Sequence, residues 1–380
     1  MRLLFLPVAL LLIAAVLVDG FEAMVLPRRV MRSYRPLRVY YKTVWRLWRS
    51  VAAHLPSGRR RESFLGIFGP LSLLLLVALW ALMLITGFAL LLWSLGLPLT
   101  APPTSEPGLG DYFYYSGVTF FTLGYGDVTP ATSLGRALAV FEAGMGLGFM
   151  AVIIGYLPSL SQAASQRELT ISLLDARAGS PPTAAEGILR AARAGHIASV
   201  EPFLAEWERW AAQLLESHLS FPVLVFYRSQ HDNQSWLASL TAVLDGCALF
   251  IAGVKGVDPY QAQLTFAMAR HAVVDLSLVL RVPPDLSGVD RMPPEQFQQL
   301  RGLLCDAGLA LDGSDVEKRY AELRAMYEPF AAGLAKYLMF QLPPILSSVH
   351  TVDNWQTSPW QPRTPGIGAL RLPAADEHFR

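Results

Sequence analysis

The stretch of sequence that decides the fold is Asp111-Tyr-Phe-Tyr-Tyr-Ser-Gly-Val-Thr-Phe-Phe-Thr-Leu-Gly-Tyr-Gly-Asp127. Its first part, 111–121, is apolar and aromatic and makes about three helical turns, too short to cross a bilayer. This length suits a re-entrant helix that enters the membrane and turns back. The next part, 122–127, has glycines at alternate positions, which permit the positive φ angles that residues with a Cβ rarely adopt. Such angles can turn successive carbonyl oxygens to the same side.

A row of backbone carbonyls can replace the water around K⁺ without a fixed charge that would trap the ion. The stretch Thr122-Leu-Gly-Tyr-Gly-Asp127 resembles the potassium channel signature, and the resemblance to that family's pore module covers about residues 64–160. It implies an outer helix, a pore helix, a selectivity filter and an inner helix, repeated in four subunits around one axis. The implied filter residues, with K⁺ held at the first four, are Thr122, Leu123, Gly124, Tyr125 and Gly126. The implied supports of the filter are Asp127, Thr119, Tyr114 and Glu142.

Two positions depart from the family pattern. Leu123 stands where the family usually has valine, which keeps the carbonyl but alters the packing behind it. Val118 stands where some members carry a glutamate four residues before the filter threonine. We therefore expect K⁺ selectivity to be retained and the stability of the filter to differ.

Three apolar stretches, 3–26, 64–97 and 134–160, are each long enough to cross a bilayer. The loop between the first two carries eleven Lys and Arg residues, whereas the segment 96–133 carries none. The positive-inside rule then places the first loop in the cytoplasm and the second outside. The N-terminus is expected outside the cell and everything after residue 160 in the cytoplasm. A cleaved signal peptide is the alternative for residues 1–26, although no small-x-small cleavage site follows Val18.

The basic loop, residues 28–61, alternates aromatic and basic residues at helical spacing, typical of a helix at the cytoplasmic membrane interface. We expect it to bind anionic lipid, because it is tethered beside a bilayer. A nucleic-acid patch is the rival interpretation. Nucleic acid is not expected as a partner.

Two features of the third span have alternative interpretations. Glu142 is a carboxyl group well inside an apolar span, where it must be neutral or paired. It either braces the pore helix through the hydroxyls of Tyr114, Tyr115 or Thr119, or faces the pore and attracts cations. The glycines of this span either form a gating hinge or allow helices to approach closely; they are Gly144, Gly146 and Gly148.

The part of the sequence after residue 160 predicts a compact α-helical domain, because apolar residues follow helical spacing between Gly/Pro clusters. Helices are expected near 167–177, 183–195, 199–218, 234–253, 260–281, 294–307 and 314–340. No Gly-x-Gly-x-x-Gly follows a predicted strand, and no span carries the regular arginines of a voltage sensor. The pair His271 and Asp275, one helical turn apart, and the separate His218 are interpreted as satisfied structural groups rather than metal ligands.

The chain is 53% hydrophobic and only 16% charged, which excludes an ordinary soluble protein. Its two cysteines are expected to be reduced cytosolic thiols. The expected domains are an N-terminal span (1–26), a basic loop (27–63), the pore module (64–160), a cytoplasmic helical domain (161–340) and a Pro-rich tail (341–380). The fold class expected is an all-α membrane protein: a tetrameric K⁺ channel pore with a soluble α-helical domain.

We expect a homotetrameric K⁺ channel in the plasma membrane that is regulated by its cytoplasmic domain. No enzymatic activity and no cofactor are expected, K⁺ being the permeant ion. A non-selective cation channel is one alternative. A membrane-anchored sensor with its main activity in the cytoplasm is the other.

Overall fold

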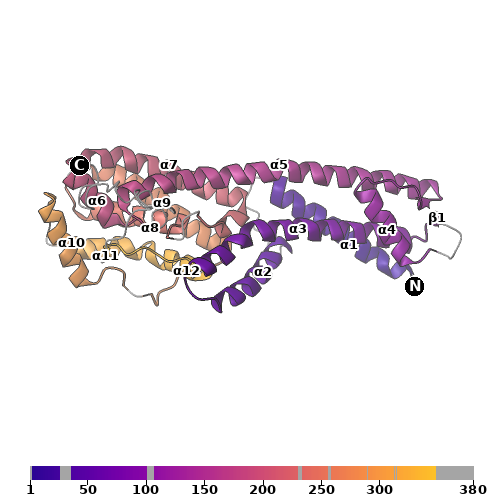
Figure 1. The fold of residues 1–380 in the computed structure, drawn as a ribbon, viewed down its shortest axis with the longest axis horizontal. Coiled ribbons are helices and arrows are strands. Elements are labelled where there is room, and N and C mark those ends of the chain that lie inside the picture. The colour runs from indigo at the N-terminus through magenta and orange to yellow at the C-terminus, as the bar shows by residue number, and fades with distance from the viewer. Residues whose placement is uncertain are drawn as a thin grey trace, which may run out of the picture. The chain divides into compact units, whose positions relative to one another are not determined.

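The structure, a computed structural model, describes residues 2–25, 36–100, 107–229, 233–255, 258–288, 290–311, 313 and 315–347. The chain forms two compact units (Figure 1). The membrane unit comprises Met1–Ala163 and Leu219–Tyr227, and the C-terminal unit comprises Ala164–His218 and Arg228–Arg380. The short segment 219–227 therefore belongs to the membrane unit, although it lies within the contiguous domain 161–340 that we expected.

The described residues are almost entirely helical, which confirms the all-α fold class. The membrane unit contains η1 (Arg2–Phe5), α1 (Leu6–Gly20), η2 (Phe21–Val25), α2 (Pro36–Ala53), α3 (Arg59–Ser94), α4 (Leu109–Phe120) and the first part of α5 (Ser133–Ala178). Two strands of two residues each, β1 (Leu99–Thr100) and β2 (Thr129–Pro130), pair antiparallel on either side of α4. The sequence pattern did not predict these strands.

Four described helices are long and apolar enough to cross a membrane. Three of them, Arg2–Met24, Arg59–Ser94 and Ser133–Ala178, overlap the three spans expected from the sequence, and the first two end two or three residues earlier than expected. The fourth is α9 (Pro259–Leu280), which we had placed in the soluble domain. Its buried face packs on α8 in the C-terminal unit, whereas three other apolar side chains of α9 are exposed in the single chain: Tyr260, Leu264 and Leu278.

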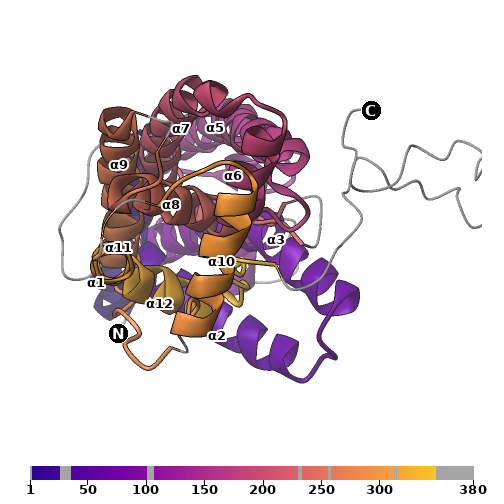
Figure 2. The ribbon, with the colours of Figure 1, turned by 90° about the vertical axis from the view of Figure 1, so that its left-hand side faces the viewer.

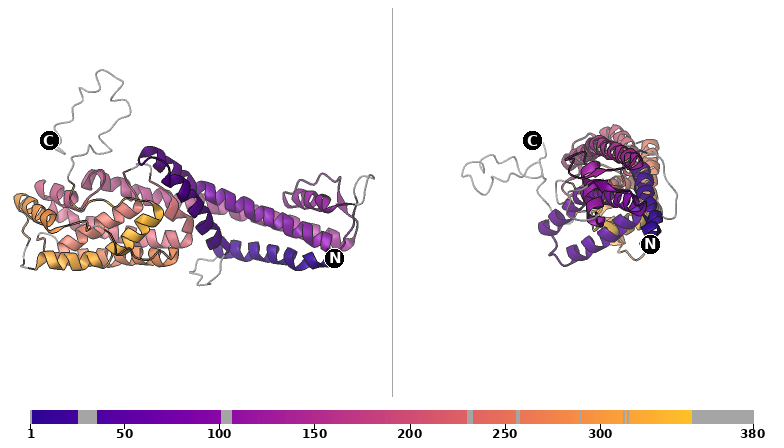
Figure 3. Two further views of the ribbon diagram at one scale, coloured as in Figure 1. Left: turned by 90° about the horizontal axis from the view of Figure 1, so that it is seen from below. Right: turned by 90° about the vertical axis from the view of Figure 1, so that its right-hand side faces the viewer.

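The first span packs along α3 through small residues (Figure 3). Ala9 and Ile13 of α1 are buried. A Cβ added at Gly87 of α3 would lie 2.7 Å from Ile13 Cγ1, so α1 can approach α3 only because Gly87 has no side chain.

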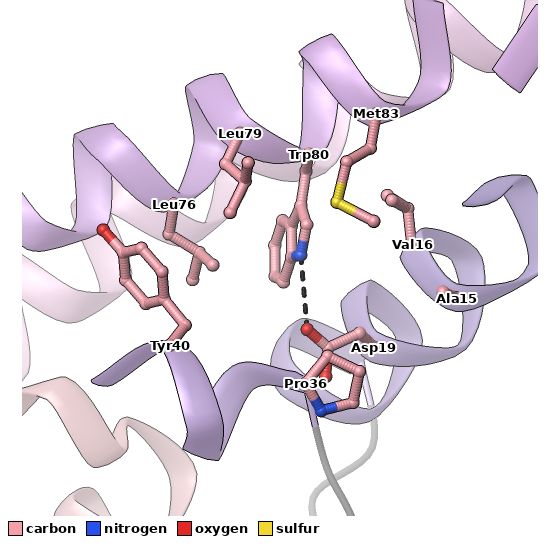
Figure 4. Close-up of a pocket in the computed structure, with 9 residues that line it drawn as sticks. All are labelled: Ala15, Val16, Asp19, Pro36, Tyr40, Leu76, Leu79, Trp80 and Met83. Atoms are coloured by element: carbon pink, nitrogen blue, oxygen red, sulfur yellow. Dashed lines mark hydrogen bonds between the residues drawn. The ribbon is translucent and has the colours of Figure 1, made fainter. Parts of the chain in front are cut away.

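Asp19 connects the end of α1 to two other helices (Figure 4). Its carboxylate is 2% exposed and accepts hydrogen bonds from the Leu37 backbone N–H and from Trp80 Nε1, each at 3.2 Å. Leu37 lies in the first turn of α2, where free N–H groups favour a negative charge. Asp19, Trp80 and Met83 also line a small cavity of about 40 Å³. These hydrogen bonds tie α1, α2 and α3 together.

The C-terminal unit is built around α8 (Trp236–Ala252), which is buried on all sides (Figure 2). A helix that is apolar all round must be surrounded by other helices; α6 (Ala184–Arg193), α9, α11 (Val316–Ala325) and α12 (Glu328–Leu338) pack against it. The remaining elements of this half of the chain are η3 (Ile197–Ser199), α7 (Val200–Ser220), η4 (Pro222–Phe226) and α10 (Pro294–Asp306).

Two predicted helix boundaries were wrong. The span 134–160 and the helix 167–177 form one helix, α5, because residues 161–166 include no glycine or proline to stop it. The helix predicted over 314–340 is divided into α11 and α12. Pro329 lies in the first turn of α12, where a missing N–H costs no helical hydrogen bond. Most of the Pro-rich tail and the basic residues at 28, 29, 32 and 35 lie outside the described residues.

Candidate functional site

The re-entrant helix predicted over 111–121 is α4, Leu109–Phe120. Asp111 in its first turn accepts a hydrogen bond from the Gly108 N–H at 2.7 Å and so caps the helix. One face, carrying Tyr112, Ser116 and Phe120, is buried. Twelve residues make a helix about 18 Å long, which cannot cross a hydrocarbon core of about 30 Å.

The backbone after α4 alternates between left-handed and other conformations. Thr122, Gly124 and Gly126 have φ angles of 55°, 62° and 80°, whereas Leu123 and Tyr125 are not in the positive region. A Cβ at either glycine would meet no atom within 4 Å, so these positions need glycine for its φ angle and not for space. The positive φ angles expected of Gly124 and Gly126 are confirmed. Alternation of this kind turns successive carbonyls toward one side.

The start of this loop is hydrogen-bonded to the last turn of α4. The Thr122 N–H donates to the Thr119 carbonyl at 3.0 Å, and the Leu123 N–H donates to the Val118 carbonyl at 2.9 Å. Thr119 therefore contacts the loop through its backbone. These bonds set the position from which the alternating segment starts.

The end of the loop is tied to α4 by a side-chain pair. The Tyr114 hydroxyl donates a hydrogen bond to Asp127 Oδ2 at 2.7 Å. Both residues were expected to support the filter, but their pairing was not predicted. The loop is therefore held to the same helix at both ends.

Glu142 of α5 is completely buried and its carboxyl group contacts the Ser116 hydroxyl of α4. The expected partners Tyr114, Tyr115 and Thr119 were wrong. Tyr114 points away from α5 and binds Asp127, whereas Ser116 lies on the buried face of α4. The spacing of Ser116, four residues from both Tyr112 and Phe120, is the signal that could have identified it.

The Ser116 hydroxyl also lies 2.9 Å from the Ile85 carbonyl of α3. A hydroxyl has one proton and so cannot donate to both Ile85 and Glu142. If Glu142 is a neutral acid, its proton goes to Ser116 and the Ser116 proton goes to Ile85. Glu142 Oε2 has no hydrogen-bond partner among the described residues, which also favours the neutral form. This chain of hydrogen bonds joins α3, α4 and α5 behind the loop.

The three glycines of α5 differ in their surroundings. A Cβ at Gly146 would lie 2.9 Å from the Phe120 carbonyl carbon and closer still to its oxygen. A Cβ at Gly144 or Gly148 would meet no atom within 4 Å. Gly146 thus allows close approach between α5 and the end of α4, the second of the two roles considered for these glycines.

The interfacial helix expected in the basic loop is α2. Trp45 and Leu37 are buried on one side of it. The other side exposes Leu47 together with Lys42 and Arg46. An exposed apolar residue beside exposed cations suits a membrane interface.

Comparison with known proteins agrees with this geometry. Residues 74–161 match the family described as "Ion channel". The chain is 28% identical to an uncharacterized membrane protein, YdjJ, of Bacillus subtilis strain 168, over 59% of this chain and 67% of YdjJ. It is 37% identical to protein LctB of Bacillus caldotenax over 20% of this chain and 62% of that protein.

A second LctB, from Geobacillus stearothermophilus, is 43% identical over 14% of this chain and 44% of its own length. The chain thus covers less than two thirds of either LctB protein. No solved structure matches the chain.

Proposed function

Residues 74–161 match the family described as "Ion channel", and from this match we propose that the chain is the subunit of a homotetrameric K⁺-selective channel. The ions would bind at the carbonyls of residues 122–125, with the Thr122 hydroxyl as a further ligand. The family match favours a transport role over an enzymatic one. The proposed domains are those expected from the sequence, with 219–227 joined to the pore.

The observation that carries the proposal is the alternation of φ at Thr122, Gly124 and Gly126 in a loop between two membrane-spanning helices. Irregular backbone at membrane depth is tolerated only where it is buried in protein or lines a water-filled path. One loop provides one wall of an ion site, so four copies around an axis are needed to surround the ion.

The surface of α5 supports a multi-subunit assembly. Val140 is 74% exposed and Leu147 is 66% exposed within a single chain. In the membrane, lipid or a neighbouring subunit covers such side chains. Glu142, by contrast, is completely buried within one chain, which favours a brace behind the filter over a pore-lining acid.

We place the channel in the plasma membrane with its N-terminus outside and the C-terminal unit in the cytoplasm. The packing of Gly87 against α1 and the hydrogen bonds of Asp19 support a first helix that stays with the protein after synthesis. The exposed face of α2 supports binding of anionic lipid at the inner leaflet. Intact mass and labelling of the N-terminus from outside the cell test the orientation.

Flux through purified full-length protein in liposomes tests the function. Reversal potentials in opposed K⁺ and Na⁺ gradients should follow K⁺, and equal permeability would indicate the non-selective alternative. The protein should also migrate as a tetramer in detergent.

The variant Gly126→Ala should lose K⁺ flux and remain tetrameric, because alanine is strained at a φ of 80°. The matched control is Gly110→Ala in the first turn of α4, where a Cβ meets no atom and φ is not positive. Selective K⁺ flux in Gly126→Ala would contradict the assignment of the ion sites.

A further inference from the structure

A short stretch of the chain returns from the C-terminal unit to the membrane unit. After Ala163 the chain builds α6 and α7 in the C-terminal unit, comes back at Leu219 and leaves again after Tyr227. We call Leu219–Tyr227 the return segment. Most of it is the short helix η4, and its ends continue directly into the C-terminal unit.

The later half of the return segment is held between α2 and α3. The Phe226 ring centroid lies 4.9 Å from the rings of both Trp45 in α2 and Phe68 in α3. Tyr227 covers Gly69 of α3, where a Cβ would lie 2.6 Å from the tyrosine ring. Gly69 therefore makes room for the return segment.

The first half of the return segment contacts the helix that follows the filter. The ring of Phe221 lies 5.2 Å from the ring of Tyr156 in α5, in an edge-to-face arrangement. Tyr156 stands directly after Gly155 and two residues before Pro158, which lies inside the helix. Proline has no N–H to donate to the carbonyl four residues earlier, so this turn of α5 resists bending less than its neighbours.

We propose that the return segment is the element through which the C-terminal unit controls opening of the pore, by acting on α5 at the turn that contains Gly155 and Pro158. This rests on the proposed channel function. Three properties support the inference. The segment contacts α2, α3 and α5 at once, it is covalently continuous with the C-terminal unit on both sides, and its contact with α5 falls on the turn that contains Gly155 and Pro158. The control point is thus about three turns beyond Gly146, one of the glycines considered as a gating hinge.

Cross-linking tests this coupling by fixing the return segment to α5 at the positions of the two rings. Cysteines replace Tyr156 and Phe221 in a background with Cys247→Ala and Cys305→Ser, and a short bifunctional thiol reagent that is cleaved by reduction joins them. Single-channel recordings should show an open probability shifted by about fivefold or more, the low end of typical allosteric coupling. The unitary K⁺ conductance should not change, and reduction should restore the open probability. The two single-cysteine variants, treated alike, are the controls.

Complete cross-linking with an unchanged open probability would overturn the proposal. Because K⁺ selectivity is measured before cross-linking, failure of the coupling is distinguished from failure of the channel function, which would leave no selective current at all.

A second variant covers the case in which the cysteine protein does not fold. Phe226→Leu keeps an apolar side chain between Trp45 and Phe68 but removes these ring contacts and the one with Tyr41. We expect a shifted open probability at unchanged conductance and unchanged tetramer content. A lower unfolding temperature with the wild-type open probability would indicate a purely structural role and would also overturn the proposal.

Discussion

Two completely buried carboxyl groups, Glu142 in the membrane unit and Asp245 in the C-terminal unit, have different kinds of partner. Glu142 meets one neutral hydroxyl and has one oxygen without a partner among the described residues. Asp245 receives Arg291 Nη2 at 2.6 Å and the Tyr327 hydroxyl at 2.5 Å. Burial by itself lowers the pKa of Arg291, but the Asp245 carboxylate outweighs it and leaves that pKa raised.

The difference reflects the surroundings of each unit. In a lipid environment an ion pair is expensive to insert, so a neutral acid hydrogen-bonded to a serine is the less costly arrangement. In the C-terminal unit the carboxylate of Asp245 is paired with the guanidinium of Arg291. That guanidinium also donates a hydrogen bond to the Pro343 carbonyl at 2.6 Å. At Glu142 the membrane unit thus uses close helix approach and a neutral hydrogen bond, and at Asp245 the C-terminal unit uses a paired charge.

The largest effect is expected where the membrane unit depends on close approach. Gly146→Ala would push α5 away from Phe120 and separate Glu142 from Ser116, costing at least about 3 kcal/mol, the upper end for overpacking. We expect loss of K⁺ flux and of the tetramer, measured in liposomes and by size-exclusion chromatography. Gly144→Ala, which meets no atom in the chain, is the matched control. Equal behaviour of the two variants would refute the close-packing role of Gly146.

In the C-terminal unit we expect the largest loss of stability when the ion pair between Asp245 and Arg291 is broken. Asp245→Ala takes away the nearer of the two carboxylates at the buried Arg291 and leaves only Glu328 Oε1 at 3.4 Å. Loss of a buried ionic partner typically costs about 3–5 kcal/mol. The free energy of unfolding, measured by denaturant titration of the full chain in detergent, should fall accordingly. Asp285→Ala is the control, because its partner Lys336 is exposed and the change should be far smaller. If the Asp245→Ala, Arg291→Met double variant is also no more stable than Asp245→Ala, the buried arginine is not the cause.

His218 is buried in the C-terminal unit in its neutral form, and this makes the stability of the unit depend on pH. Burial, and then the nearby Arg167, lower the pKa of His218 to about 3. Its Nδ1 donates to the Leu214 carbonyl at 2.7 Å, and Nε2 accepts from Arg167. The unfolded chain takes up a proton near pH 6.5 and the folded chain does not, so stability is complete above that pH and falls below it.

Between pH 7 and pH 5 the loss should be about 2 kcal/mol. His218→Gln cannot titrate and should remove this part of the pH dependence, measured as unfolding free energy at both pH values. His271→Gln is the control, because that side chain is 59% exposed. An unchanged pH slope in His218→Gln would mean that His218 is already protonated in the folded chain.

The smallest effect is expected for Glu142→Gln. Glu142→Gln replaces a neutral acid by a neutral amide that can still donate to Ser116, so K⁺ flux and stability should change by less than about 1 kcal/mol. Glu142→Ala removes the donor and leaves a cavity, at a cost of about 2–3 kcal/mol. Thermal stability of the tetramer and single-channel recordings measure both. Equal effects of the two variants, with altered conductance, would favour a pore-facing Glu142 and break the comparison with Asp245.

Local patterns were sufficient to predict the features that depend on neighbouring residues in the chain. The three apolar spans, the short α4 and the positive φ angles of Gly124 and Gly126 all follow from lengths, hydropathy and the lack of a Cβ. The helices of the C-terminal unit were also predicted, except where Pro329 starts α12 and where nothing stops α5 at residue 160.

Other features depend on contacts between residues far apart in the sequence. Hydropathy could not show that the buried face of α9 packs on α8, and residue type could not distinguish Ser116 from three other hydroxyls as the partner of Glu142. The sequence of Leu219–Tyr227 by itself did not indicate that this segment belongs to the membrane unit. Spacing along a chain determines which face of a helix is apolar or which residue can take a positive φ. Only tertiary packing determines which residues contact that face. Those residues come from other helices, and residue spacing within one helix does not show where the other helices lie.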